Sequence, residues 1–387
     1  AADHELASEH EVAQMGAIVA QAIEAGALGF STSRTEKHKD VNGVVTPTIS
    51  AEANELVGIA QAVGQTGKGV LQGISDFYDF DSEFALFKRM AQESGRPISL
   101  TVEQQDARPQ WWTQLLDGIT QAQSEGIAMY GQVPPRATGV LLGLTATLNP
   151  FLFYPPYRQI AGLPLAEKVA IMRTDEFRAA MLSAKPVDRD APLVEEILYG
   201  FNKLYQLGDP ANYEPDPKDA FGPRAARAGV RVEEMIYDAL LEKDGKALLY
   251  HPLFNYEPGN LDHVKKMLEH PYTLHGLGDA GAHCGALCDA SFPTTLIQHW
   301  GRDRVRGDKI ALQKLIAMQT RATASQVGLN DRGLLKPGYR ADVNVIDFER
   351  LTLHEPEVVY DLPAGGRRLV QRATGYEATI VAGKVAF

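Results

Sequence analysis

The stretch AEANELVGIAQAVGQTGKGVLQGIS, residues 51–75, decides the fold class. Residues 51–64 carry apolar side chains at helical spacing, a glycine-rich turn follows, and residues 69–75 form a short run of β-formers. The same unit recurs along the first third of the chain. The predicted helices cover 11–25, 51–64, 82–94 and 111–124, and the strands that follow them cover 27–33, 69–75, 97–103 and 127–133. This alternation indicates βα units around a parallel sheet, so the predicted fold class is α/β.

Residues 135–245 lose this rhythm. They are rich in proline and contain an acidic amphipathic helix predicted at 193–204. We interpret this segment as an inserted lid over a site, because long irregular segments in compact domains usually carry function. Further strands are predicted at 246–253 and 273–279, helices at 261–269 and 309–325, and a few short strands after residue 330.

Periodicity leaves two architectures open, a doubly wound sheet and a (β/α)8 barrel of the TIM type. A barrel needs eight strands, whereas the sequence offers six, one of which could be an extra ribbon beside the barrel wall. A closed barrel would therefore need further strands before Ala1. We expect an incomplete barrel over 1–330, with the lid at 135–245, and a small C-terminal β segment over 331–387.

Composition and charge limit the partners. The formal net charge is −11 and no run of Lys or Arg exceeds two residues, which argues against a nucleic-acid or anionic-membrane surface and favours a small-molecule substrate. Cys284 and Cys288 are too close for a disulfide framework, which fits a reducing compartment. No leader or membrane-spanning stretch is recognisable, so we expect a cytoplasmic protein.

Asp279 is the strongest candidate for chemistry. It ends the strand predicted at 273–279, in the run GLGDAGAHCG. A carboxylate at the C-terminal end of a barrel strand points into the shared mouth, where it can act as metal ligand, general base or both. The alternative is an Asx turn that caps the next helix. His283 and His251 are candidate substrate-binding residues at the same mouth, with backbone bonding and core packing as their respective alternatives.

Two arginines follow predicted strands and could bind a substrate carboxylate. Arg34 follows GFSTS and Arg136 lies in QVPPRATG, and a guanidinium offers a carboxylate two parallel donors. Either could instead pair with a structural acid. The chain contains no HxH, HExxH, CxxC or CxxH pair, so no local motif completes a zinc site.

Three motifs resemble one known family. They are GALGFSTSRT at 26–35, GDAGAH at 278–283 and RGLLKPGYRADVNVIDF at 332–348. Together they are similar to the N-acyl-D-amino-acid deacylases (D-aminoacylases) of the amidohydrolase superfamily, over essentially the whole chain. The resemblance implies a (β/α)8 barrel with a small β-sandwich and metal-dependent hydrolysis of an amide bond. The family's HxH strand would lie upstream of Ala1.

The resemblance also implies a reduced metal site. Gln72, together with Glu103 or Gln104, occupies the two positions where the family carries histidine ligands at the ends of strands five and six. Asp279 matches the aspartate that contacts the metal-bound water and shuttles its proton. We therefore expect at most one firmly held ion, most simply zinc, on an upstream HxH and Asp279, with Glu103 as an extra oxygen ligand.

The expected function is metal-dependent hydrolysis of N-acyl-D-amino acids or a similar carboxylate-bearing amide, with Asp279 as proton shuttle. The alternative is a catalytically silent, ligand-binding relative, or an inactive fragment that needs a missing N-terminal piece. Unpaired strand edges of an incomplete barrel would need a cover, so we expect that piece or self-association into a homo-oligomer.

Overall fold

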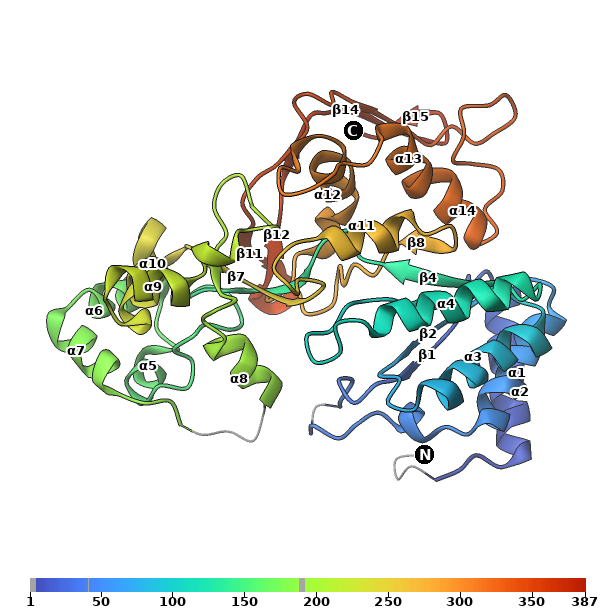
Figure 1. The fold of residues 1–387 in the computed structure, drawn as a ribbon, viewed down its shortest axis with the longest axis horizontal. Helices are drawn as coiled ribbons and strands as arrows, with labels where there is room; N and C mark the ends of the chain where they lie inside the picture. The colour runs from blue at the N-terminus through green and yellow to red at the C-terminus, as the bar shows by residue number, and fades with distance from the viewer. Residues whose placement is uncertain (1–4, 41, 188–191) are drawn as a thin grey trace.

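The main sheet of the molecule is parallel and has five strands. The computed structural model describes residues 5–40, 42–187 and 192–387. The strands are β1 (Gly29–Arg34), β2 (Val70–Ser75), β3 (Ile98–Thr101), β4 (Met129–Val133) and β8 (Thr273–His275). They lie in the order β1-β2-β3-β4-β8, all parallel (Figure 1). The predicted α/β class is therefore confirmed.

The register brings the carboxyl ends of these strands to one edge of the sheet. Gln72 pairs with Ser31 on one side and with Ser99 on the other. On the far side of the sheet, Val133 of β4 pairs with His275 of β8. Residues that follow each strand therefore meet at the same edge, where sites form in parallel sheets.

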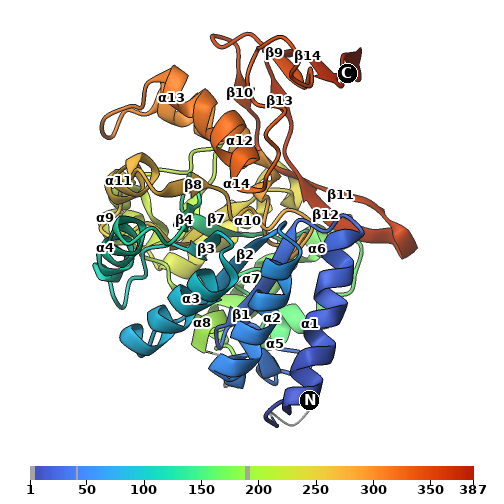
Figure 2. The ribbon, with the colours of Figure 1, turned by 90° about the vertical axis from the view of Figure 1, so that its right-hand side faces the viewer.

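Helices cover the side of the sheet away from the lid (Figures 1 and 2). They are α1 (Glu9–Glu24), α2 (Ala53–Gln65), α3 (Phe80–Ser94), α4 (Trp111–Ser124) and α11 (Asp262–Glu269). Helix α2 shows why the sequence pattern works, since its buried residues Leu56, Ala60 and Val63 lie on one face at helical spacing. All five helices begin within two residues of their predicted starts.

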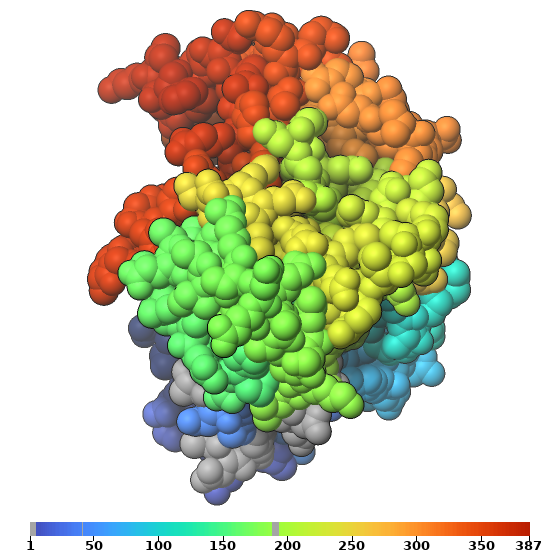
Figure 3. Space-filling model, turned by 90° about the vertical axis from the view of Figure 1, so that its left-hand side faces the viewer, coloured from blue at the N-terminus to red at the C-terminus, as the bar shows by residue number. Residues whose placement is uncertain are grey.

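The predicted lid is a packed unit with its own sheet and core. Its strands are β5 (Thr138–Leu142), β6 (Tyr205–Gln206) and β7 (Leu249–Phe254), in the antiparallel order β5-β7-β6. Its helices are α5 (Pro155–Ile160), α6 (Leu165–Met172), α7 (Asp175–Ser183), α8 (Pro192–Tyr199), α9 (Phe221–Ala228) and α10 (Val232–Gly245). Buried Leu142, Met172 and Leu240 belong to a core that is separate from the core of the main sheet. Figure 3 shows this unit, in green and yellow, on one face of the molecule.

The strand predicted at 246–253 belongs to this lid. It becomes β7, which pairs with β5, so it is the extra ribbon among the six candidate strands. The predicted helix at 193–204 is also shorter than expected, because α8 ends at Tyr199 and Gly200 follows it. Glycine ends a helix readily, since it tolerates the backbone conformations that helix ends require.

The C-terminal part combines short helices with small antiparallel sheets. Its elements are α12 (Phe292–Gln298), α13 (Leu312–Ala317), α14 (Thr323–Gln326), β9 (Val343–Ile346), β10 (Thr352–Leu353), β11 (Glu357–Leu362), β12 (Gly366–Val370), β13 (Ala373–Thr374), β14 (Tyr376–Val381) and β15 (Lys384–Val385). The helix predicted at 309–325 is split by a π-helical turn, Met318–Ala322. The hairpin of β11 and β12 reaches back to the loop after β8, where the main-chain nitrogen of Leu369 donates to the Cys284 carbonyl oxygen at 2.7 Å.

The sheet does not close into a barrel within the described residues, because β1 and β8 lie at its two edges. Five strands cannot complete the eight-stranded ring of a TIM barrel. No helix in the described ranges is both long enough and apolar enough to span a lipid bilayer.

Candidate functional site

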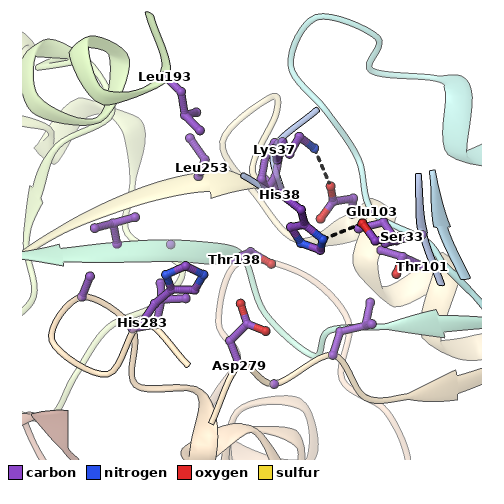
Figure 4. A pocket seen from close by; sticks show the side chains of 18 of the residues that line it. Ser33, Lys37, His38, Thr101, Glu103, Thr138, Leu193, Leu253, Asp279 and His283 are labelled. Atoms are coloured by element: carbon purple, nitrogen blue, oxygen red, sulfur yellow. Dashed lines mark hydrogen bonds and ion pairs between the residues drawn. The ribbon is translucent and has the colours of Figure 1, made fainter. Parts of the chain in front are cut away.

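An open cavity of about 970 Å³ lies where the carboxyl ends of the main sheet face the lid. The strand ends and the loops after them contribute polar side chains, and the lid contributes mostly apolar ones. The polar lining residues are Ser31, Thr32, Ser33, Lys37, His38, Thr46, Thr48, Gln72, Thr101, Glu103, Gln132, Thr138, Asp279 and His283. Figure 4 shows several of them around a common space.

Asp279 projects into this cavity, as its position after a strand predicts (Figure 4). It lies four residues beyond the end of β8 and is exposed. Its main-chain nitrogen donates to Oδ2 of Asp289 at 3.3 Å, and its carbonyl oxygen accepts from the nitrogen of Ala282 at 3.0 Å. The backbone of the loop is therefore held, while the Asp279 carboxylate faces the cavity.

Glu103 reaches the cavity just beyond the end of β3 and is almost fully buried. Lys37 Nζ lies 3.4 Å from Glu103 Oε1 and 3.8 Å from Asp76 Oδ1. Burial raises the pKa of Glu103, and the neighbouring Lys37 ammonium opposes this rise. The end of β3 thus holds a carboxyl group that already has a cation as partner.

A serine–histidine pair lies on the same wall. Ser33 Oγ and His38 Nδ1 are 2.6 Å apart, and both residues line the cavity (Figure 4). The backbone fixes this loop, because Thr46 donates its N–H to the His38 carbonyl oxygen at 3.0 Å. Sequence reasoning missed Lys37 and His38. The available signal was the polar run TEKHKD at 35–40, directly after β1, at the edge where sites form.

His283 also lines the cavity, as expected. Its backbone has φ of 47°, an uncommon conformation for a residue with a side chain. Its carbonyl oxygen accepts from the nitrogens of Ala286 and Leu287 at 2.7 and 3.0 Å. The ring therefore projects from a tight turn, and substrate binding by His283 stays a prediction.

Arg34 does not line the cavity, which corrects its predicted role. Its guanidinium forms a two-point ion pair with Glu83, with Nε to Oε2 and Nη2 to Oε1 both at 2.8 Å. Nη1 donates to the carbonyl oxygen of Ala51 at 2.8 Å. Arg34 therefore joins β1 to α3. Because Glu83 and Ala51 occupy its N–H donors, it has no pair of donors left for a substrate carboxylate.

Arg136 is likewise a structural residue. It is 3% exposed, and it donates to Ser291 Oγ at 3.1 Å and to the Cys288 carbonyl oxygen at 3.0 Å. Its guanidinium carbon lies 3.6 Å from the ring centroid of Tyr213. The side chain borders a different, smaller cavity of about 330 Å³, so its predicted contact with substrate at the mouth is corrected.

His251 lies within the lid and away from the cavity. Its side chain is fully buried, neither ring nitrogen has a hydrogen-bond partner among the described residues, and Nε2 approaches Gly200. Burial lowers its pKa to about 3. His251 is therefore a core residue of the lid. The prediction that it faces the cavity at the carboxyl end of the sheet is wrong.

The donor set for a metal is incomplete in the described residues. Within the ranges 5–40, 42–187 and 192–387, no three His, Cys, Asp or Glu side chains are grouped to hold an ion. Gln72 lines the cavity as an amide, and Gln104 is buried, with its Oε1 accepting from the nitrogen of Glu257 at 3.1 Å. Asp279 and Glu103 remain as two oxygen donors, and Glu103 already pairs with Lys37. Protein metal sites need three or four ligands, so these residues do not fit a zinc ion by themselves.

Comparisons with known proteins agree with the observed architecture. A model of the amidohydrolase family matches residues 1–387. No curated protein matches the chain in sequence. The solved structures that match include a D-aminoacylase described with a binuclear metal centre, a D-aminoacylase variant in complex with copper chloride, and a D-aminoacylase described as defining a novel subset of amidohydrolases.

The structural likeness is one of fold. The first two structures have TM-scores of 0.56 and the third 0.55, and all three are 16% identical to this chain. The matches cover 99% of this chain and 64% of each D-aminoacylase chain. The chain thus spans about two thirds of the length of these structures.

Proposed function

Because the chain belongs to the amidohydrolase family, we propose that the protein hydrolyses the amide bond of N-acyl-D-amino acids or of a similar carboxylate-bearing amide. The observation that carries this proposal is the position of Asp279, whose carboxylate faces a large cavity at the carboxyl end of the sheet. A carboxylate there can take a proton from an attacking water and pass it to the departing amine.

Lys37 is the proposed partner of the substrate carboxylate. Among the described residues that line the cavity, it is the only lysine or arginine. Its ion-pair distances of 3.4 and 3.8 Å to Glu103 and Asp76 are long enough for a closer anion to compete. His38, whose Nδ1 lies 2.6 Å from Ser33 Oγ, lines the same cavity and is available to hydrogen-bond the substrate.

A zinc ion stays part of the sequence-based prediction. The described side chains offer two oxygen donors and not a complete set, so they do not hold a metal ion by themselves. A firmly bound ion would need further ligands from other residues of the whole protein.

The test is turnover of the longest available form of the protein on N-acetyl-D-amino acids, with the L-enantiomers as controls and release of free amine as readout. We expect Asp279→Asn to lower turnover at least ~100-fold, the range of general acid–base catalysis. The fold should persist, because the Asp279 side chain is exposed and its backbone contacts do not use the carboxylate. Undiminished turnover in this variant would remove Asp279 from the mechanism.

The second candidate is a ligand-binding protein without hydrolytic activity. The incomplete metal donor set and the Lys37–Glu103 pair favour it. The two edge strands, β1 and β8, are where a second copy would add strands. Intact mass read together with metal content separates the two, since a 42.3 kDa species without metal and without turnover supports the second candidate.

A further inference from the structure

The wall of the cavity on the lid side is apolar. It meets the wall that carries Lys37, His38 and Glu103 at Phe254, whose ring centroid lies 4.3 Å from Lys37 Nζ. Its side chains come from β5, the loop after β5, α8, β7 and the loop after β8. They are Val140, Leu148, Leu193, Ile197, Leu253, Phe254, Ala286 and Leu287.

This wall is the outer surface of a packed core. Val140 and Ile197 belong to the lid core, and Leu148, Leu253 and Leu287 pack against it from outside. Leu193 at the start of α8 is 42% exposed and borders the cavity. An apolar surface that faces a cavity marks a site for an apolar group, because burial of such a surface is favourable.

The cavity has a polar side and an apolar side, which adjoin at Lys37 and Phe254. In Figure 4, Lys37, His38 and Glu103 lie on one side, and Leu193 and Leu253 on the other. Asp279 projects from the floor between these groups in this view. A bound molecule with a charged end, a central reacting bond and an apolar end would match this order.

We propose that the apolar wall binds the acyl chain of the substrate, and that the protein prefers medium- and long-chain acyl groups over acetyl. This inference rests on the proposed function. In an N-acyl amino acid, the carboxylate lies on the amine side of the amide bond. If Lys37 takes that carboxylate and the amide lies at Asp279, the acyl group extends toward the lid.

A binding experiment tests the inference without any turnover. Saturated fatty acids from hexanoate to dodecanoate carry the acyl chain but no bond to hydrolyse. Calorimetric titration below their critical micelle concentrations should show affinity rising roughly fourfold per methylene, the value for full burial of that group. Leu193→Gln and Leu253→Gln should flatten this dependence.

Leu334→Gln is the matched control. Leu334 is 46% exposed, a fraction similar to the 42% of Leu193, and it does not line the cavity. This variant should keep the chain-length dependence of the parent protein. The inference would be overturned if Leu334→Gln flattened the chain-length dependence as much as the cavity variants do. It would also be overturned if the affinity of the parent protein did not depend on chain length.

Hydrolysis of an N-acyl-D-amino-acid series separates this inference from the proposed function. Hydrolysis with kcat/KM that does not depend on acyl length would keep the proposed function and overturn the acyl-chain site. Chain-length-dependent binding without any hydrolysis would keep the acyl-chain site and overturn the proposed function.

Discussion

The main-chain nitrogen of Asp279 donates to Oδ2 of Asp289 at 3.3 Å. The buried Asp289 carboxylate thus holds the loop that carries the exposed Asp279 carboxylate. Asp289 in turn lies 3.5 Å from Arg136, and both side chains are at most 4% exposed. Burial raises the pKa of Asp289, and the Arg136 guanidinium opposes the rise. Asp289 therefore connects Arg136 to the backbone of the loop that carries Asp279.

Arg136→Met should destabilise the fold by about 3–5 kcal/mol, because it leaves the Asp289 charge buried without its partner. Urea unfolding measures the change. Arg158→Met is the control, since Arg158 is exposed and should shift stability by no more than ~0.5 kcal/mol. A fully stable Arg136→Met protein would contradict the assigned role.

Arg34→Met should destabilise by about 3 kcal/mol or more without raising KM. The Arg34–Glu83 pair is mostly buried, with side chains 13% and 18% exposed, so loss of one partner leaves a poorly solvated charge. Lys68→Met breaks the Lys68–Glu24 pair, whose side chains are over half exposed, and should cost at most ~1 kcal/mol. Weaker substrate binding in Arg34→Met, with unchanged stability, would restore the earlier substrate-binding prediction.

Lys37→Met should raise KM for a carboxylate-bearing substrate roughly ten- to hundredfold, since a hydrogen bond to a charged group contributes about 1.5–3 kcal/mol. Lys37→Arg keeps the positive charge, so its KM should lie between those of the parent protein and Lys37→Met. The same change removes the cation that opposes the effect of burial on Glu103, so the pKa of that carboxyl should rise further. Carbon NMR of the Glu103 carboxyl across pH reads this shift, and an unchanged KM would separate Lys37 from substrate binding.

Stability should fall on acidification below the ordinary histidine pKa. Burial lowers the pKa of His251 to about 3 and the pKa values of His263 and His275 to about 4, from 6.5. Between pH 6.5 and about 4 the unfolded chain binds protons that the folded protein excludes, so each histidine removes about 1.4 kcal/mol per pH unit. Urea unfolding at pH 7, 6 and 5 measures the slope.

His251→Leu provides the control for this slope. The substitution removes one of these three titrating groups, and both ring nitrogens of His251 lack hydrogen-bond partners in the described structure. The variant should therefore lose about a third of the pH dependence that the three histidines contribute. A slope equal to that of the parent protein would show that His251 is not protonated on unfolding in this range.

The sequence by itself determined the helices and strands of the first third of the chain and the position of Asp279 at the site. Helical spacing in residues such as Leu56, Ala60 and Val63 is fixed by near neighbours, so α1 to α4 and the strands between them were predictable. Asp279 was predictable for a similar reason, because a residue after a parallel strand must emerge at the carboxyl edge of the sheet.

Only the tertiary structure decided which distant groups meet. The strand that became β7 reads like the others, but its ladder partner is β5 in the lid. Arg34 and Lys37 are three residues apart, yet Glu83 neutralises the first and the second reaches the cavity. Charge pairing and strand pairing depend on partners many residues away in the sequence. Local periodicity does not show which of the possible partners lies nearest in the folded protein.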